Sequence, residues 1–205
     1  IVPRPAPPRA AARRPCSEPR LLSTLSPTVP GREAKLIGLL GCLEPQIKIR
    51  DDVELLVLRD LRSLTIGEKR NRMISIARGE YVIFVDDDDA VTTDYVAAIA
   101  SMLRSHGPDV LCFTVTVRGQ GPDKPCRYDP SMRTENLAGE YRRKPNHLMA
   151  WRRALAASVP FPTLRFGEDT QWADAMAKLA KNVATIDRAL YVYQFDASDN
   201  SSTPR

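Results

Sequence analysis

The sequence predicts an α/β fold in which helices flank a mainly parallel sheet within a single domain. Short apolar runs rich in β-branched residues alternate with segments of helical periodicity, a pattern typical of βαβ units. The 205 residues suffice for one full core, and contents of 43% hydrophobic and 27% charged residues are ordinary for a globular protein. Acidic residues directly follow two of the apolar runs, at the edge of the sheet where parallel strands end.

Hydrophobic periodicity places the elements along the chain. We predict strands at residues 21–26, 53–58, 81–85, 110–117, 183–186 and 189–195. We predict helices at residues 31–43, within 66–79, and at 94–105, 147–158 and 167–179. Pro45 is predicted to end the first helix, Gly79 the second in the left-handed conformation, and Gly107 the third. Residues 118–147 are rich in glycine, proline and charge, so we expect a long irregular loop with a functional role.

The two ends of the sequence differ from its centre. Residues 1–20 are rich in proline, alanine and arginine and predict an extended or disordered tail; residues 21–195 form the predicted domain, and residues 196–205 a polar C-terminal tail. Five arginines and one glutamate in the first 20 residues account for +4 of the net charge of +5, so the remainder is nearly neutral. This distribution weakens a nucleic-acid-binding interpretation. A local basic cluster is still expected to reach phosphate groups, and its members are Arg142, Arg143, Lys144, Arg152 and Arg153.

The sequence carries no membrane or zinc signature. No apolar run approaches the roughly 20 residues that span a bilayer, and no apolar segment follows the N-terminal arginines as in a secretory signal. We therefore expect no membrane insertion and a cytoplasmic location. The four cysteines lack zinc-binding spacing, and Cys42 and Cys112 lie in apolar surroundings that predict core positions. A reducing compartment fits best, while a count of four leaves two disulfides open.

The most informative stretch is the strand at residues 81–85 and the four acids that follow it, Asp86, Asp87, Asp88 and Asp89. Four adjacent carboxylates repel one another and favour a bound cation. Strand alternation projects Asp86 and Asp88 to the same side. Two carboxylates at the end of a buried strand suit Mg²⁺ or Mn²⁺, with a phosphate ligand completing the coordination. The alternative is a solvated acidic turn before the helix that starts near Asp94.

Several segments taken together resemble the glycosyltransferase family 2 enzymes, which have the GT-A (Rossmann-like) fold. These segments are Ser26-Pro27-Thr28, Asp60, Gly67-Glu68-Lys69-Arg70-Asn71, residues 77–89 and Gly167-Glu168-Asp169. The resemblance spans residues 21–195, and the combination is far more specific than a DxD motif alone. One position departs from the family, whose pattern is usually Asp-Ser-Asp-Asp. The middle residue here is Asp87, which leaves open which carboxylates bind the metal.

The resemblance implies a metal-dependent, inverting transfer of a sugar from a nucleotide-sugar, with a UDP-sugar as the expected donor, to an acceptor hydroxyl. It implies a pocket for the uracil or ribose at Thr28 and Asp60, and a pyrophosphate site near Lys69, Arg70, Asn71 and Asp87. It implies Mn²⁺ or Mg²⁺ bound by Asp86 and Asp88, with His147 as a third ligand, and a catalytic base at Asp169 with Glu168 beside it. The chemistry agrees, because a cation stabilises a leaving diphosphate and a carboxylate activates a hydroxyl.

Alternatives remain open at each of these positions. Arg70 and Asn71 also suit a helix N-terminus, Asp60 a turn, and Glu168-Asp169 a first helical turn favoured by the macrodipole. His147 also suits a packed position, while Trp151 and Trp172 are predicted in the core, with Trp172 as an alternative floor for the acceptor.

The function also has alternatives. The expected acceptor is a saccharide or a hydroxylated base in DNA, since the chain lacks the membrane helices of lipid-linked systems. A binding module without catalysis has no need of a base at Asp169. A nucleotidyltransferase would carry a glycine-rich, basic loop after the first strand, where residues 26–31 are interrupted by prolines. The sequence does not predict the donor sugar or the oligomeric state.

Overall fold

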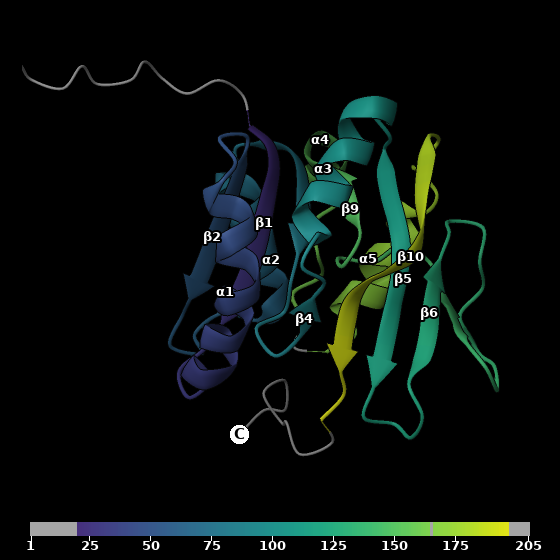
Figure 1. Ribbon diagram of the computed structural model, residues 1–205, viewed down its shortest axis with the longest axis horizontal. Coiled ribbons are helices and arrows are strands. Elements are labelled where there is room, and N and C mark those ends of the chain that lie inside the picture. The colour runs from purple at the N-terminus through teal and green to yellow at the C-terminus, as the bar shows by residue number, and fades with distance from the viewer. Residues whose placement is uncertain (1–19, 165, 197–205) are drawn as a thin grey trace, which may run out of the picture.

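The apolar runs of the sequence form the centre of one large mixed sheet (Figure 1). We describe residues 20–164 and 166–196 of a computed structural model. Within these residues ten strands join in the order β2-β1-β3-β9-β5-β6-β8-β7, with β10 beside β5 and β4 beside β10. This mostly parallel sheet with flanking helices confirms the predicted fold class.

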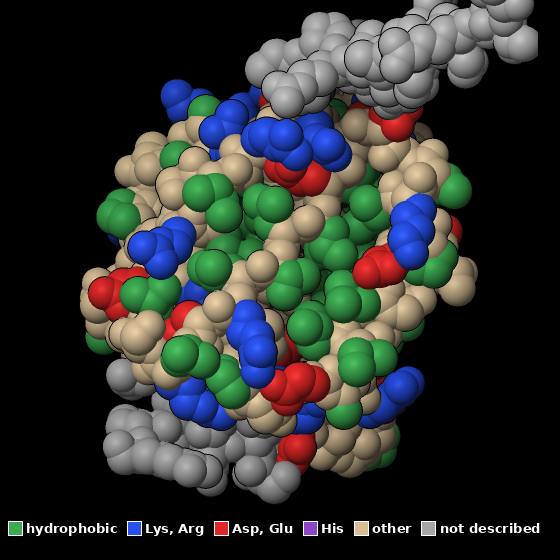
Figure 2. Space-filling model, turned by 90° about the vertical axis from the view of Figure 1, so that its left-hand side faces the viewer, with side chains coloured by type: hydrophobic (Ala, Val, Ile, Leu, Met, Phe, Trp, Pro, Cys, Tyr) green, Lys and Arg blue, Asp and Glu red, His purple; other side chains and the backbone are tan. Residues whose placement is uncertain are grey.

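The strands that carry the acidic residues lie side by side. Strand β1 (Arg20–Thr28) pairs in parallel with β2 (Val53–Arg59) on one side and β3 (Gly79–Phe84) on the other. All three therefore end at the same edge of the sheet, which places Thr28, Asp60 and Asp86 near one another. Strand β2 is the outermost strand of this group. Hydrophobic side chains gather on the side of the molecule where β2 lies (Figure 2).

Helices cover both faces of the sheet. Helices α1 (Glu33–Lys48) and α3 (Tyr95–His106) pack together on one face. Helices α2 (Ile66–Ile76), α4 (Arg153–Ser158) and α5 (Glu168–Met176) lie on the other (Figure 1). Thr65 and Glu68 form a capping box that starts α2. Gly107 ends α3, as predicted, and has the left-handed conformation.

Pro45 does not end the first helix, which continues to Lys48. A proline inside a helix removes one hydrogen bond, so the last turn needs other support. Gln46 provides it: its Nε2 donates to the carbonyls of Cys42 and Thr92 at 2.9 Å each, and its Oε1 accepts from the amide of Val96 at 3.0 Å. These contacts with the start of α3 hold the end of α1 in place.

Gly79 does not cap α2 either, because it is the first residue of β3 and its φ is not positive. A Cβ at this position would lie 2.5 Å from the backbone nitrogen of Ser23 in β1. The glycine is therefore required by the close approach of two strands and not by a helix end.

The segment from 118 to 152 contains more strand than we predicted. Strands β6 (Lys124–Tyr128), β7 (Glu135–Asn136) and β8 (Tyr141–Arg143) extend the sheet beyond β5 (Val110–Arg118), where an irregular loop was expected. The predicted helix at residues 147–158 is wrong in its first half. Residues Ala150–Arg152 form β9, which fills the gap between β3 and β5 and pairs antiparallel with both.

The C-terminal strands also differ from prediction. Residues Val183–Gln194 form one long strand, β10, with irregular register after Ile186, where two short strands were expected. Strand β10 runs parallel to β5 and pairs antiparallel with the short β4 (Ala90–Val91). It therefore reaches the edge of the sheet where the four aspartates lie.

The core is rich in aromatic side chains. Phe161 stacks on Trp172 with ring centroids 4.4 Å apart, and Trp151 meets Trp172 edge-on at 5.4 Å. Trp172 is 2% exposed, so it is a core residue and not the floor of an acceptor site. Cys112 and Cys126 are buried and free, but Cys42 is exposed, contrary to its predicted core position.

Some predictions concern the ends of the chain. Residues 1–19 of the predicted tail and residues 197–205 lie outside the described residues, whereas Arg20 already belongs to β1. Among the helices in residues 20–164 and 166–196, none combines the length and apolar character needed to cross a membrane.

Candidate functional site

The four aspartates at the end of β3 form a tight turn, which we call the acidic turn (Asp86–Asp89). The strand ends at Phe84, and the amide of Asp89 donates to the carbonyl of Asp86 at 3.2 Å. Our argument from strand alternation is therefore wrong at these residues. The turn nevertheless separates two kinds of acid: the side chains of Asp86 and Asp88 are 26% and 23% exposed, while that of Asp87 is 4% exposed and residue Asp89 is also 4% exposed.

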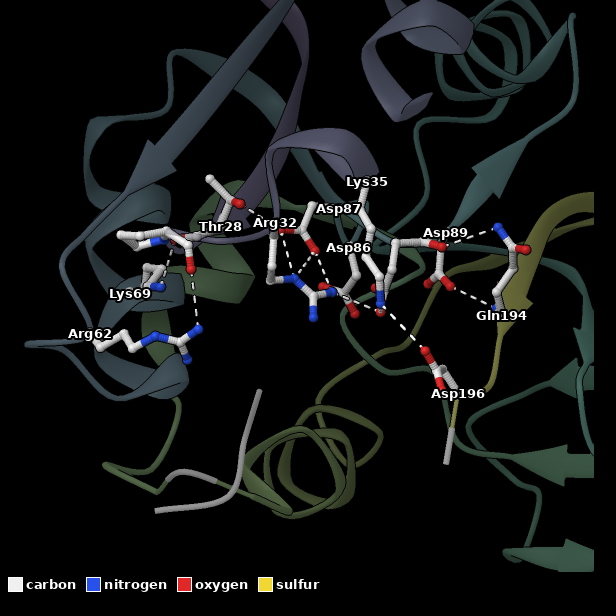
Figure 3. Close-up of polar contacts among 12 residues, drawn as sticks. Thr28, Arg32, Lys35, Arg62, Lys69, Asp86, Asp87, Asp89, Gln194 and Asp196 are labelled. Atoms are coloured by element: carbon white, nitrogen blue, oxygen red, sulfur yellow. Dashed lines mark hydrogen bonds and ion pairs between the residues drawn. The ribbon is translucent and has the colours of Figure 1, made fainter. Parts of the chain in front are cut away.

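Asp87 is held by the first strand and the first helix (Figure 3). Thr28 Oγ1 donates to its Oδ2 at 2.5 Å. Arg32 Nε donates to both Asp87 oxygens, at 2.8 and 3.0 Å, and Arg32 Nη2 lies 2.6 Å from Oδ1. The middle acid, where this chain departs from the family pattern, thus anchors an arginine beside the turn.

Asp89 is held by β10. Tyr191 Oη donates to Asp89 Oδ2 at 2.6 Å, and the amide of Gln194 donates to Oδ1 at 2.8 Å. Burial and then the charge of Asp86 raise the pKa of Asp89 well above its usual range. Both donors are neutral, so they satisfy the oxygens of Asp89 without supplying a positive charge.

Asp88 is the exposed acid nearest to the cations of α1. Arg32 Nη2 lies 2.7 Å from its Oδ2, and Lys35 Nζ lies 3.7 Å from the same oxygen. Burial is the largest cause that raises the pKa of Asp88, and the carboxylates of Asp86 and Asp87 add to it, so the pKa stays above its usual range in spite of Arg32. Asp88 therefore lies in an environment with an excess of negative charge.

Asp86 contacts two groups other than the cations beside Asp88. His147 Nε2 lies 3.2 Å from its Oδ2, and Arg70 Nη2 lies 3.4 Å from its Oδ1. Burial would raise the pKa of Asp86, but His147 and Arg70 outweigh that effect and hold it well below its usual range. Asp86 is therefore an anion under ordinary conditions.

Arg70 joins the acidic turn to the start of α5. Its guanidinium is buried, lies 5.6 Å from the ring centroids of both Phe84 and Phe161, and forms an ion pair with Glu168. Glu168 is only 5% exposed and bound in this pair, so its carboxylate is in no position to meet an incoming hydroxyl. Glu168 positions Arg70 and the first turn of α5.

His147 lies between Asp86 and Asp169. Its Nε2 faces Asp86, and its Nδ1, buried and without a hydrogen-bond partner, lies 3.7 Å from Asp169 Oδ2. The Asp169 side chain is 31% exposed, and its other oxygen accepts from the amide of Thr170 at 2.8 Å. Asp169 is thus an accessible carboxylate that one imidazole separates from the acidic turn.

The ends of β1 and β2 meet at Lys69. Its ammonium donates to the carbonyl of Thr28 at 3.1 Å and forms an ion pair with Asp60. Burial would raise the pKa of Asp60, but Lys69 and the amide of Leu64 lower it below its usual value. The structure therefore brings Thr28 and Asp60 to one place, as the sequence predicted, and joins them through Lys69, which was predicted beside the pyrophosphate.

Some residues singled out in the sequence lie elsewhere. Asn71 binds the backbone of Phe161 in both directions, at 2.9 and 2.8 Å, so its amide is occupied and its role is structural. The predicted basic cluster is also dispersed. Arg152 and Arg153 contact Glu80 and Gly79 at the other end of β3, and Arg142 and Lys144 pair with Glu140 and Asp174.

Two cations beside the acidic turn were missed in the sequence. Arg32 and Lys35 come from the loop and first turn after β1 (Figure 3). The available signal was their position directly after Gly31, at the carboxyl end of a parallel strand, where ligands of α/β sheets bind.

The donor set of the acidic turn suits a hard divalent cation. Asp86 and Asp88 offer partly exposed carboxylates within a turn of excess negative charge, which is the ligand type that Mg²⁺ and Mn²⁺ prefer. In residues 20–164 and 166–196 no group of three or more His, Cys, Asp or Glu side chains is already arranged around one point. A cation on these two acids would therefore need further oxygens from a ligand or from water, as Mg²⁺ sites commonly do.

A cavity of about 500 Å³ lies against Asp88, bordered by α1 and the end of β10.

Residues 48–157 match the family model for glycosyl transferase family 2. The chain belongs to this family. The match covers more than half of the sequence and includes the acidic turn, Asp60 and His147. A search of curated proteins gave no match.

Solved structures show the same fold as this family 2 domain. Residues 1–349 of TarS from S. aureus in complex with UDP-GlcNAc share 19% identity with a TM-score of 0.65, over 90% of this chain and 61% of that chain. The same protein in complex with UDP shares 21% identity with a TM-score of 0.63, over 86% and 61% of the two chains. The mannosyltransferase PcManGT from Pyrobaculum calidifontis in complex with GDP-Man and Mn²⁺ shares 15% identity with a TM-score of 0.60, over 87% and 58%. The chain spans about three fifths of the length of these structures, and the likeness confirms the GT-A fold.

Proposed function

We propose that this family 2 domain transfers a sugar from a nucleotide-sugar to an acceptor hydroxyl, with a divalent cation and with inversion at the anomeric carbon. The observation that carries the proposal is the position of His147, which contacts Asp86 of the acidic turn on one side and faces Asp169 on the other. Charge stabilisation of the leaving group and deprotonation of the acceptor must occur on opposite sides of the transferred sugar. One imidazole between the two acids is compatible with that requirement.

The nucleotide is proposed to bind where β1 and β2 end. Thr28, Asp60 and Lys69 meet there, and Asp60 is the acid available for a uracil or a ribose hydroxyl. Structures with the same fold hold UDP-GlcNAc, UDP and GDP-Man. We propose UDP as the nucleotide.

Asp86 and Asp88 are the proposed ligands of Mn²⁺ or Mg²⁺, and His147 orients Asp86. A cation held there would supply Lewis-acid stabilisation of the charge that grows on the leaving diphosphate. Arg70, fixed by Glu168, adds a positive charge to the same side of the turn. Asp87 and Asp89 hold the turn to α1 and β10 through Arg32, Tyr191 and Gln194.

Asp169 is the proposed base. Its exposed carboxylate takes the proton of the acceptor hydroxyl while the oxygen forms a bond to C1 of the sugar. The bond from C1 to the diphosphate oxygen breaks at the same time, and its electron pair leaves with the nucleoside diphosphate. One displacement of this kind inverts the configuration at C1. The acceptor is proposed to be a saccharide or a hydroxylated DNA base.

Nucleoside diphosphate release tests the proposal. The protein is incubated with Mn²⁺ and a panel of UDP-, GDP- and other nucleotide-sugars, with and without candidate acceptors. We expect release from one donor that increases with the right acceptor and disappears in EDTA. Binding of a donor without any release across the panel would indicate a binding module. Release of pyrophosphate from a nucleoside triphosphate would indicate a nucleotidyltransferase.

A further inference from the structure

Arg32 is bound to the acidic turn in two different ways. Its Nε and Nη2 form a fork on Asp87, a carboxylate that is almost fully buried and also accepts from Thr28. The same Nη2 reaches across to Oδ2 of Asp88, an exposed acid, at 2.7 Å. The first contact is an anchor inside the protein, and the second pairs the guanidinium with a carboxylate whose side chain is 23% exposed.

The oxygen covered by Arg32 belongs to one of the two proposed metal ligands. A carboxylate oxygen paired with a guanidinium at 2.7 Å does not offer the same lone pair to a divalent cation. A cation beside Asp88 would also be repelled by the positive charge of Arg32. Both effects favour a competition between the arginine and the metal for one oxygen.

We propose that Arg32 acts as a built-in counter-ion of Asp88 and that a divalent cation binds only when the guanidinium leaves this oxygen. The inference rests on the proposed metal-dependent function and deepens it. The two contacts of Arg32 Nε with Asp87 keep the side chain at the site when Nη2 leaves Asp88, so the exchange needs a rotation of the guanidinium and not a movement of the loop. Arg32 thereby lowers the affinity of the acidic turn for a cation alone.

Lys35 provides the matched control. Its ammonium carries the same charge and lies 3.7 Å from the same Asp88 oxygen, but its side chain is more exposed than that of Arg32, at 37% against 11%, and its distance from Asp88 is 1.0 Å longer. If only the loss of positive charge near Asp88 mattered, Arg32→Gln and Lys35→Gln would raise the Mn²⁺ affinity by similar amounts. If Arg32 competes by direct contact, Arg32→Gln is expected to raise the Mn²⁺ affinity much more than Lys35→Gln.

The test is Mn²⁺ binding to the full chain without nucleotide, followed by the EPR signal of free Mn²⁺. We expect Arg32→Gln to bind Mn²⁺ about tenfold more tightly than the wild type, which corresponds to about 1.4 kcal/mol. We expect less than a threefold change for Lys35→Gln. Circular dichroism melting establishes that each variant is folded. If Arg32→Gln does not fold, Arg32→Lys decides the question, because a lysine does not form the fork that spans two carboxylates.

Three outcomes overturn the inference. If Arg32→Gln or, in its place, Arg32→Lys binds Mn²⁺ no more tightly than the wild type, while Asp88→Asn abolishes binding, the competition is rejected and the metal-dependent function stands. If Lys35→Gln tightens binding as much as Arg32→Gln, the effect is one of general charge and the role of Arg32 is rejected. If neither wild type nor variant binds Mn²⁺ even with UDP present, both the inference and the proposed metal site fail.

Discussion

Acids at the two ends of the sheet are neutralised differently. At the amino end of β2, the buried carboxylate of Glu54 accepts from Ser23 Oγ at 2.6 Å, from the amide of Arg78 at 2.7 Å and from its Nη2 at 2.7 Å, with Arg20 Nε at 3.6 Å. At the carboxyl end of β3, three of the four carboxylates of the acidic turn share Arg32, Lys35 and Arg70, and Arg70 also pairs with Glu168. One end has two guanidinium groups for one acid, and the other has fewer cations than acids.

This difference in neutralisation indicates that Glu54 serves stability and that the acidic turn serves binding. A buried acid with every oxygen satisfied stabilises the fold, and its removal leaves donors unpaired. A group of acids with incomplete neutralisation is costly to the folded state and retains affinity for a cation. We therefore expect substitutions at the acidic edge to change chemistry and binding, and substitutions at Glu54 to change stability.

The largest expected effect is that of Asp169→Asn. The amide keeps the shape of the side chain and removes the proton acceptor, so turnover should fall by roughly 10²- to 10⁴-fold while donor affinity stays within a few-fold. Steady-state turnover, donor calorimetry and melting temperature are measured on the same preparation. Asp174→Asn is the control, since Asp174 is an exposed acid of the same helix. Near-normal turnover with lowered stability in Asp169→Asn would assign the residue a structural role.

The next effect concerns nucleotide binding. We expect Asp88→Asn to lose most of the Mn²⁺-dependent affinity for UDP, by roughly ten- to a hundredfold, because one of the two exposed carboxylates is removed. Isothermal titration with Mn²⁺ or with EDTA measures this. Asp196→Asn is the control, because Asp196 also lies 3.7 Å from Lys35 but outside the acidic turn. Equal UDP affinity of the wild type in Mn²⁺ and in EDTA would contradict the metal site.

For stability we expect a larger effect from a substitution at Glu54 than from one in the acidic turn. Glu54→Gln should lower the free energy of unfolding by about 2 kcal/mol at pH 7, since charged hydrogen bonds to Ser23 and Arg78 are lost. In a domain of this size the melting temperature should then fall by about 4–8 °C. Asp88→Asn should change it by less than about 2 °C. Similar losses in both variants would remove the distinction between the two edges.

The pH dependence of stability should also distinguish Glu54. Burial raises the pKa of Glu54, but Ser23 and Arg78 outweigh it, so the folded-state pKa lies below the ordinary value. The folded state then binds the Glu54 proton less readily than the unfolded state. Its stabilisation is present above the ordinary pKa, about 4.3, and is lost as the pH falls through the lower folded value. Calorimetric melting should therefore show the difference between wild type and Glu54→Gln shrinking from pH 7 to pH 3, and a constant difference would argue against this assignment.

The smallest effect is expected at the N-terminus. Deletion of residues 1–19, predicted from composition to be a tail, should leave the melting temperature within one or two degrees. Deletion through Arg20 should lower it further, because Arg20 Nη1 donates to the carbonyl of Val53 at 2.8 Å and Nε lies near Glu54. A loss of more than about 5 °C from the shorter deletion would show that the tail packs on the domain.

The sequence was most informative where local patterns determine structure. The strands β1, β2, β3 and β5 contain apolar runs long enough to recognise, and the order of parallel strands predicts that Thr28, Asp60 and Asp86 lie at one edge. The choice between Glu168 and Asp169 needed the structure. The two acids are adjacent in a helix, and only packing decides that Glu168 meets Arg70 while Asp169, 31% exposed, lies beside His147.

Long-range pairing explains the remaining errors. Strand β9 has three residues, and its conformation comes from β3 and β5 on either side and not from its own propensity. Pro45 is tolerated because Gln46 binds a distant helix. Arg32 reaches Asp87 across 55 residues of sequence, a contact that no local pattern encodes.

The hydrogen bonds of Asp89 have a consequence for biosynthesis. Tyr191 and Gln194, its two donors, follow it by 102 and 105 residues, whereas β1, β2 and β3 are all complete by residue 84. A chain emerging from the ribosome can therefore pair its first three strands long before the segment that binds Asp89 is made. Until the final strand is translated, this carboxylate has only water to satisfy it. The edge that contains the acidic turn is thus expected to be the last part of the parallel sheet to reach its native form.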